Sequence, residues 1–164
     1  MTKRINQQNW LERDDTLNSF VKVRPTGTTE PISGQEWAEL MLKPQLLVSA
    51  PKEVQRLFEG ARGALIYGYF YYGLCFIGMV ALFRVAEAAL AHKCKELAAP
   101  KTAAESDMRF DENIEWLASQ GIVQSTDWTM IAEARNGGFH PQQIITLLEQ
   151  VAEKINALFP VQSS

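Results

Sequence analysis

The sequence contains few of the side chains from which metal sites and nucleophilic active sites are built. Its 164 residues include only two cysteines and two histidines. Cys75 and Cys94 lie in apolar helical surroundings, with no CxxC spacing and no set of His and Asp residues that would complete a metal site. We therefore expect no metal ion and no other cofactor, and we interpret the two cysteines as reduced, buried thiols of a cytoplasmic protein.

Several familiar catalytic motifs are also missing. The chain has no Gly-rich phosphate-binding loop, no HExxH motif and no Gly-x-Ser-x-Gly motif. These absences argue against NTPases, metallohydrolases and serine hydrolases that use those motifs. Residues 1–8 have neither the apolar stretch nor the cleavage site of a signal peptide, which agrees with a cytoplasmic location.

The chain has no excess of positive charge. It carries 16 basic and 19 acidic residues, for a net charge of −3 and a pI near 5.4. As a whole, such a protein repels a phosphate backbone. Any contact with nucleic acid is therefore expected to be local.

A long uncharged segment, residues 63–83, lies between Arg62 and Arg84 and reaches the length of a membrane span. Glycine recurs in it at every fifth position, tyrosines crowd its centre, and the amphipathic pattern continues past both of its ends. We therefore predict two buried helices that meet near residues 72–74, and no contact with a membrane. A membrane-associated helical protein is the third alternative for the function.

The aromatic cluster at residues 67–72 could stack bases, as proteins that bind single strands do. Its continuity with an apolar helix favours core packing and a dimer interface instead, because tyrosine is a good interface anchor. Tyr71 and Tyr72 are neighbours and cannot both face inward.

Residues 1–48 form an N-terminal extension of mixed character. Ser33 and Glu36 have the spacing of a capping box, which predicts a short helix that runs to about Lys43. Residues 26–31 have the composition of a linker or exposed loop, and residues 20–24 could be extended.

From residue 49 to residue 160 the apolar spacing is that of a helical bundle. It predicts helices over residues 49–72 and 76–97, one capped by Asp107 and closed at Gly121, one capped by Ser125, and one that begins at Pro141. The last carries an apolar stripe of Ile144, Leu148, Val151, Ile155 and Leu158. The expected fold is an all-α, antiparallel helical bundle with an N-terminal extension, a tail at residues 161–164 and no sheet.

Between the last two predicted helices lies the segment Arg135-Asn136-Gly137-Gly138-Phe139-His140. In a continuous helix Arg135 and His140 would lie roughly 140° apart, so we expect the paired glycines to break the helix. An Arg-Asn-x-x-x-His sequence between the last helices of a small α-bundle resembles the signature of the HEPN superfamily. The resemblance covers about residues 49–159 in outline, and it extends to the acidic residue Glu87 on a long apolar helix.

The resemblance implies a homodimer in which two such motifs face each other. In many relatives it also implies a metal-independent endoribonuclease of a toxin or antiviral defence system, with RNA as substrate and an antitoxin or another protein as partner. In that case His140 is the general acid and base, Arg135 binds the scissile phosphate, and Asn136 positions His140 or the phosphate. The alternative is a non-catalytic HEPN-like module that binds a protein or a nucleotide.

Each of these side chains also has a purely structural interpretation. Arg135 can be a cation near a helix C-terminus, Asn136 a turn residue, and His140 a helix N-cap. Glu87 lies on an apolar stripe of its helix and needs a partner. Arg135 is the functional candidate for that partner, and Arg84, one turn away, is the structural candidate.

A small basic group, His92, Lys93 and Lys95, lies on the same predicted helix as Arg84. These four cations could contact RNA phosphates, or they could belong to a solvated helix face. His92 and Cys94 are two residues apart and point in different directions, so we do not interpret them as metal ligands.

Overall fold

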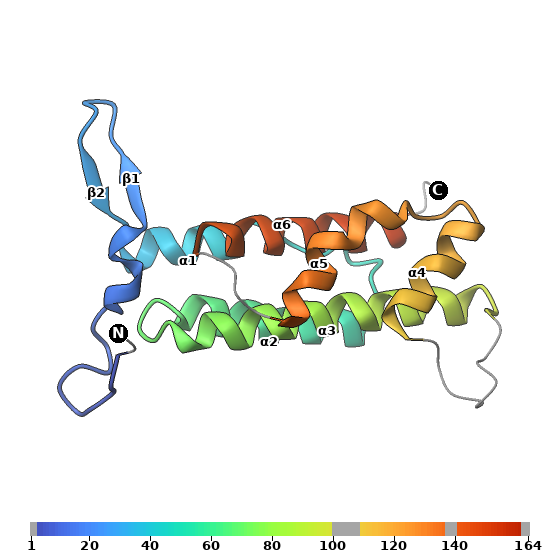
Figure 1. The fold of residues 1–164 in the computed structure, drawn as a ribbon, viewed down its shortest axis with the longest axis horizontal. Coiled ribbons are helices and arrows are strands. Elements are labelled where there is room, and N and C mark those ends of the chain that lie inside the picture. The colour runs from blue at the N-terminus through green and yellow to red at the C-terminus, as the bar shows by residue number, and fades with distance from the viewer. Residues whose placement is uncertain (1–2, 100–108, 137–140, 162–164) are drawn as a thin grey trace.

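The computed structural model describes residues 3–99, 109–136 and 141–161. The protein is mainly helical, with 64% of its residues in helices, and the mainly-α class predicted from the sequence is confirmed. The α-helices are α1 (Gly34–Leu42), α2 (Lys52–Tyr67), α3 (Gly73–Glu96), α4 (Phe110–Ser119), α5 (Thr129–Glu133) and α6 (Pro141–Leu158). In Figure 1, α2 and α3 lie side by side in one layer, α1 and α6 lie along a second layer, and α4 and α5 lie between the layers.

The uncharged segment folds as two helices, as predicted. Helix α2 ends at Tyr67 and α3 begins at Gly73, so the turn lies at residues 68–72. Helix α3 packs against α2, α4 and α6, and this central position accounts for its apolar composition. By length and composition alone α3 could cross a membrane, but half of its most apolar window is buried inside the protein.

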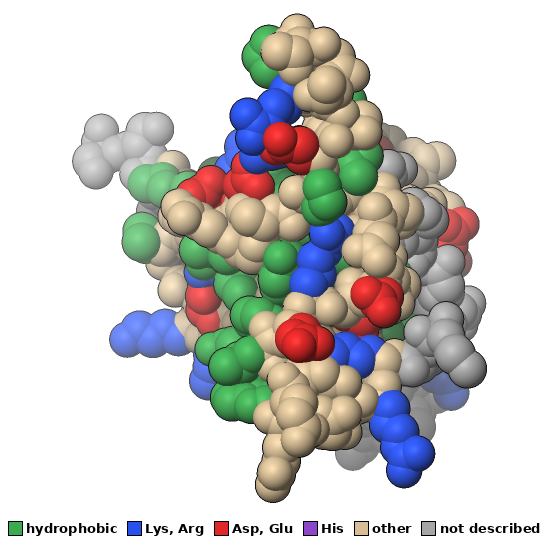
Figure 2. Space-filling model, turned by 90° about the vertical axis from the view of Figure 1, so that its left-hand side faces the viewer, with side chains coloured by type: hydrophobic (Ala, Val, Ile, Leu, Met, Phe, Trp, Pro, Cys, Tyr) green, Lys and Arg blue, Asp and Glu red, His purple; other side chains and the backbone are tan. Residues whose placement is uncertain are grey.

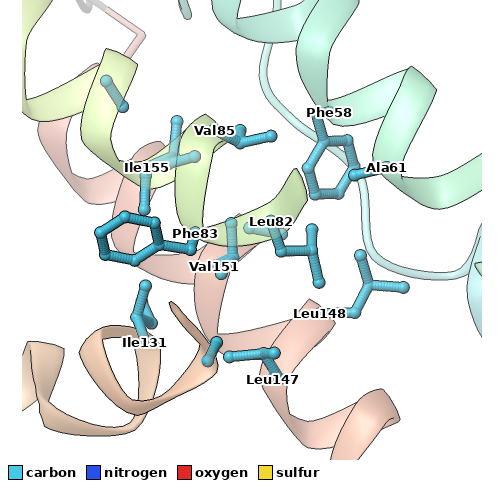
Figure 3. Packing of buried hydrophobic residues seen from close by; sticks show 14 of the residues in the cluster. Phe58, Ala61, Leu82, Phe83, Val85, Ile131, Leu147, Leu148, Val151 and Ile155 are labelled. Atoms are coloured by element: carbon cyan, nitrogen blue, oxygen red, sulfur yellow. The ribbon is translucent and has the colours of Figure 1, made fainter. Parts of the chain in front are cut away.

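Helix α6 provides one wall of the core through the predicted apolar stripe. All five of its members are buried: Ile144, Leu148, Val151, Ile155 and Leu158. In Figure 3, Leu148, Val151 and Ile155 lie beside buried side chains of α2 and α3, among them Phe58 and Leu82. Each side chain of this size contributes about 1.5–3 kcal/mol when it leaves water, so burial of the stripe favours packing of α6 against the α2–α3 pair.

Helix α4 and the segment after it differ in part from the prediction. Gly121 closes α4 with a φ of 72°, as expected of a C-terminal cap, while Asp107 lies outside the described residues. Ser125 does not cap one continuous helix. The segment is divided into η2 (Ser125–Trp128), α5 and η3 (Ala134–Asn136), where η marks a 3-10 helix.

The reason for this division is the spacing of the buried side chains. Trp128, Ile131 and Ala134 are all buried and lie three residues apart. Three residues per turn is the period of a 3-10 helix, so tight turns at both ends of α5 keep all three side chains on the core side.

The prediction of a fold with no sheet is wrong in the N-terminal segment. Strands β1 (Val21–Val23) and β2 (Thr29–Pro31) pair antiparallel, with Val21 opposite Pro31, and form a hairpin that projects from one end of the protein (Figure 1). Gly27 has a φ of 80° in the turn between them. Three-residue strands are too short to show a clear period-two pattern, and a proline such as Pro31 is more typical of a loop than of a strand.

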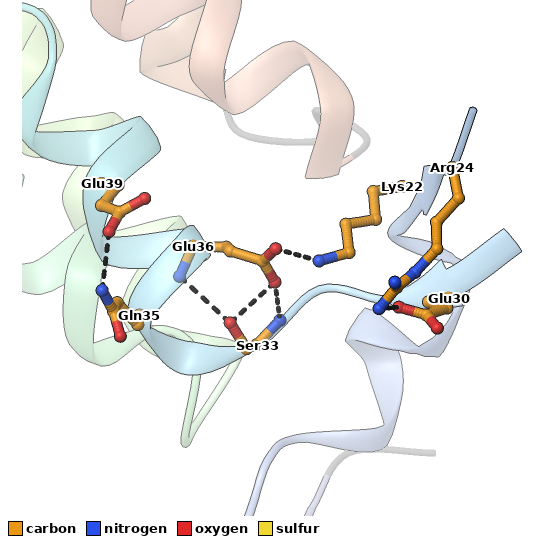
Figure 4. Close-up of polar contacts among 7 residues, drawn as sticks. All are labelled: Lys22, Arg24, Glu30, Ser33, Gln35, Glu36 and Glu39. Carbon is orange, nitrogen blue, oxygen red and sulfur yellow. Dashed lines mark hydrogen bonds and ion pairs between the residues drawn. The ribbon is translucent and has the colours of Figure 1, made fainter.

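Charged contacts hold the hairpin to α1. The predicted capping box is present, because Ser33 caps α1 and the Glu36 carboxylate accepts the backbone N–H of Ser33 at 2.9 Å. The same carboxylate pairs with Lys22 of β1, and Arg24 pairs with Glu30 across the hairpin (Figure 4). The Lys22 ammonium and the Ser33 donors together lower the pKa of Glu36 to about 2.

The N-terminal segment shares its core with the rest of the chain. Leu17, Trp37 and Met41 are fully buried and belong to the same apolar cluster as the side chains of α2, α3 and α6. The Trp37 indole N–H donates a hydrogen bond of 2.9 Å to the backbone carbonyl of Leu65 in α2. The extension is therefore packed as part of the bundle.

Candidate nucleic-acid interface

Arg135, the first residue of the motif, is exposed on η3 and lies against an aromatic ring of α3. Its guanidinium carbon is 5.7 Å from the centroid of Phe83. The guanidinium carbon of Arg84 is 5.9 Å from the same centroid. Phe83 itself is 2% exposed, so two positive groups cover one buried ring in cation–π geometry.

An aromatic row supports that ring from behind. The Phe83 ring packs on Phe110 at the start of α4, with a centroid distance of 4.8 Å. Phe110 in turn meets Trp128 edge to face at 6.4 Å. The row connects α3, α4 and η2, so the platform under Arg135 belongs to the rigid core and not to a loop.

Glu87 pairs with its structural candidate. Its carboxylate Oε2 is 2.6 Å from Nη1 of Arg84, one turn earlier on α3, and its side chain is 34% exposed. Among the described contacts, the Glu87 carboxylate therefore fixes Arg84 and not Arg135. Arg84 is two-thirds exposed, so it keeps N–H groups that face solvent.

The rest of the motif is only partly described. Asn136 is the last residue of η3, and α6 begins at Pro141. The first two residues of the motif thus end a helical segment, and the described chain continues with α6. Residues 137–140, which include His140, and the side chain of Asn136 lie outside the described part of the structure.

Two of the basic residues further along α3, His92 and Lys93, lie next to acidic side chains. His92 lies 3.2 Å from a Glu53 carboxylate oxygen, and Lys93 lies 3.1 Å from one of Glu96. Lys93 also covers the ring of Phe159 at 5.5 Å. Lys95 is exposed and has an interaction of its own. This pattern is that of a solvated, charge-paired helix face, the structural alternative given above.

The structure also has a cavity that the sequence analysis missed. Its volume is about 340 Å³, and it lies between α4 and the η2–α5 segment. We call it the α4–α5 cavity; it is lined by Asp111, Ile114, Glu115, Ser125, Trp128, Thr129 and Ala132. These residues lie in two segments, and nothing in the sequence indicates that the two segments meet.

The described residues offer no candidate metal site. They contain no group of three or more His, Cys, Asp or Glu side chains able to hold a metal ion. Cys75 and Cys94 are buried and unpaired, as predicted. Burial raises the pKa of the Cys75 thiol to about 12 and that of Cys94 to about 11, so neither is a thiolate at neutral pH.

The arrangement as a whole can bind an anion. Arg135 and Arg84 are exposed and each places its guanidinium near the Phe83 ring, and arginine is the residue best suited to contact phosphate groups. Comparison of the chain with models of known protein families, with curated proteins and with solved structures found no match.

Proposed function

We propose that this protein is a HEPN-like endoribonuclease that binds RNA at Arg135 and cleaves it without a metal ion. The observation that carries the proposal is the exposed Arg135 guanidinium, held on the buried Phe83 ring beside Arg84 and immediately before Asn136. Two exposed arginines whose guanidinium groups both lie near one buried ring suit a phosphate better than a simple helix cap does.

The chemistry requires three groups around one phosphate. A base takes the proton of the RNA 2′-hydroxyl, whose oxygen then bonds to phosphorus while the bond from phosphorus to the 5′-oxygen breaks. An acid donates a proton to that leaving oxygen, and a cation stabilises the charge on the crowded phosphate. His140 supplies the acid–base groups and Arg135 the charge, with Asn136 as the positioning residue.

A homodimer completes this set. One protomer offers a single motif histidine, whereas base and acid catalysis of the same step need two groups on opposite sides of the phosphate. Two-fold pairing of the Arg135 surfaces supplies two copies of His140. The cytoplasmic location, the toxin or defence setting and an antitoxin partner follow from the composition and the HEPN resemblance.

The second candidate function is a non-catalytic HEPN-like module that binds a protein. It is favoured by exposed apolar side chains at the α2–α3 end: Tyr67 is 63% exposed and Ile77 is 55% exposed. Figure 2 views this end, where hydrophobic side chains gather below the projecting hairpin. Exposed aromatic and aliphatic groups of this kind are typical anchors for a protein partner.

The test is cleavage of a mixed RNA pool in EDTA by the purified wild type, His140→Ala and Arg135→Ala. We expect the wild type to cut, His140→Ala to be inactive, and Arg135→Ala to be reduced by about 10²- to 10³-fold, because it loses the cation at the phosphate. Arg56→Ala is the matched control, since Arg56 is exposed on α2, and it should retain wild-type activity.

Circular dichroism and size-exclusion chromatography must show the same fold and oligomeric state for all four proteins. Cleavage that survives in folded His140→Ala contradicts the proposed chemistry. If the wild type binds RNA through Arg135 but does not cut it, the non-catalytic module becomes the better description.

A further inference from the structure

We propose that the α4–α5 cavity is a nucleobase subsite that selects guanine next to the phosphate held by Arg135. This inference rests on the proposed function, because it assumes that RNA lies across Arg135. It adds the part of the RNA that is recognised, which the motif does not indicate.

The cavity and Arg135 lie on the same stretch of chain, which runs through η2, α5 and η3. Ser125, Trp128 and Ala132 line the cavity, and Arg135 follows Ala132 by three residues, in η3. From Ala132 to Arg135 the helix rises roughly 4.5–6 Å. That rise is comparable with the separation between a base and its own phosphate group.

The α4 wall of the cavity is also close in sequence to a residue that supports the Arg135 contact. Asp111 lines the cavity and follows Phe110, whose ring packs on Phe83. Phe83 is the ring that carries the Arg135 guanidinium. One wall of the cavity therefore lies three residues from Arg135 in the sequence, and the other adjoins the Phe110–Phe83 pair on which Arg135 packs. In this proposal, one nucleotide contacts the cavity and the guanidinium together.

The floor and rim of the cavity match a flat, hydrogen-bonding ligand. Ile114 and Trp128 line the cavity and are buried, so its floor is apolar, as suits the flat face of a base. The exposed rim carries the carboxylates of Asp111 and Glu115 and the hydroxyl of Thr129. Single-stranded RNA is commonly read in this way, through a splayed base whose Watson–Crick edge meets side chains.

The two carboxylates decide which base fits. An ionised carboxylate has only acceptor oxygens. Guanine presents two adjacent N–H donors, on N1 and on its exocyclic amine, and these match the two oxygens of one carboxylate. Uracil presents its single N–H between two carbonyl oxygens, which a carboxylate repels. Adenine and cytosine offer one amino group each and should rank between them.

The experiment measures binding without cleavage. Fluorescently labelled pentanucleotides UUGUU, UUAUU, UUCUU and UUUUU carry 2′-O-methyl groups throughout, which removes the attacking hydroxyl. We expect the wild-type protein to bind UUGUU on the order of tenfold more tightly than UUUUU, the size of effect that one good two-point base contact gives. Fluorescence anisotropy measures the four dissociation constants.

Three variants and one control separate base recognition from charge. Asp111→Asn combined with Glu115→Gln should reduce the guanine preference to about twofold or less, and Glu115→Gln alone should reduce it in part. Glu133→Gln removes a negative charge from an exposed position of α5 outside the cavity, and it should keep the preference. Arg135→Ala should weaken binding of all four oligonucleotides by the same factor, because a phosphate contact carries no base information.

The outcomes distinguish the two proposals. Equal binding of all four oligonucleotides, or a guanine preference that persists in the folded double variant, overturns the nucleobase subsite while RNA binding at Arg135 stands. If no oligonucleotide binds to the wild type, the subsite and the proposed function both fail.

Discussion

The carboxylate of Asp14 accepts a hydrogen bond of 2.8 Å from the backbone N–H of Tyr72. Asp14 is 1% exposed, so a buried side chain of the N-terminal segment caps the start of α3. Two further contacts tie the same segment to the α2–α3 turn. The backbone N–H of Asp14 donates to the Tyr69 carbonyl at 2.9 Å, and the Lys3 ammonium donates to the Phe70 carbonyl at 2.9 Å.

Replacing Asp14 with Asn should destabilise the protein by about 1–2 kcal/mol at pH 7. One carboxylate oxygen accepts from Tyr72 and the other from the Thr16 N–H at 2.9 Å, and an amide can satisfy only one of these donors. Burial alone raises the pKa of Asp14, but these donors and Lys3 outweigh it, so the net pKa lies below its ordinary 3.8. Urea unfolding at several pH values measures the effect.

The pH dependence gives the sign of this effect. The pKa of Asp14 is lower in the folded protein than in the unfolded chain. The stabilisation that its ionised carboxylate adds to the free energy of unfolding is therefore complete above about pH 4 and is lost as the pH falls through the pKa of the folded state. The difference between wild type and Asp14→Asn should therefore shrink below pH 4. Asp15→Asn, at the exposed neighbouring position, is the control. An equal loss of stability in both variants would contradict the capping role.

Replacement of two helical glycines by alanine should change the stability of the protein in opposite directions. A Cβ at Gly78 of α3 would lie 2.6 Å from Cδ2 of Leu65 and 3.1 Å from the backbone oxygen of Ala61. A Cβ at Gly60 of α2 would have nothing within 4 Å. We expect Gly78→Ala to cost about 1–3 kcal/mol through overpacking and Gly60→Ala to add roughly 0.5–1 kcal/mol through helix propensity.

Thermal and urea unfolding of the two glycine variants measures these changes. If Gly78→Ala is as stable as Gly60→Ala, then α2 and α3 do not approach each other as closely as the structure shows. The pair is a matched comparison, because the same methyl group is added to the same kind of backbone.

The helices could be predicted because their signals are local. The capping box at Ser33, the left-handed cap at Gly121 and the apolar stripe of α6 each lie within a few turns of chain. The extended conformation of β1 was among the expectations for residues 20–24, but β2 and the pairing of the two strands were not predicted, because such short strands do not show a clear alternation. The hydrogen bond between Asp14 and Tyr72 joins residues 58 positions apart in the sequence, and no local sequence pattern predicts such a contact.

In the candidate site, too, the local features could be predicted from the sequence and the long-range contacts could not. The resemblance of the segment that begins at Arg135 to a known motif is a local feature of the sequence, whereas the packing of Arg135 on Phe83 and of Phe83 on Phe110 depends on how three helical segments pack. The partner of Glu87 was left open between Arg84 and Arg135, because helix spacing favours the first and the resemblance favoured the second. The α4–α5 cavity has walls from separate segments and had no signal at all.

Replacing Glu87 with Gln tests the two interpretations of that residue. The structure pairs Glu87 with Arg84, so the variant should release Arg84 and leave RNA binding equal to or slightly tighter than wild type. Its free energy of unfolding should change by less than about 1 kcal/mol, as for other exposed pairs. Glu96→Gln, which breaks the Lys93 pair on the same helix, is the matched control.

RNA binding by Glu87→Gln can be measured by anisotropy and its stability by urea unfolding. A selective loss of RNA binding, with Glu96→Gln unaffected, would mean that Glu87 orients Arg135 after all. Unchanged binding by both variants agrees with the pairing that the structure shows.

The salt dependence of RNA binding tests whether Arg135 contacts a phosphate. Each phosphate contact on a single strand contributes about −0.7 to the slope of log affinity against log salt concentration. Arg135→Ala should therefore weaken binding and make that slope shallower by about 0.7, while Arg56→Ala changes neither. Arg135→Lys should keep the slope but bind less tightly, because an ammonium cannot form the two-point contact of a guanidinium. Weaker binding with an unchanged slope would show that Arg135 acts on RNA by holding the fold around Phe83, and not through its charge.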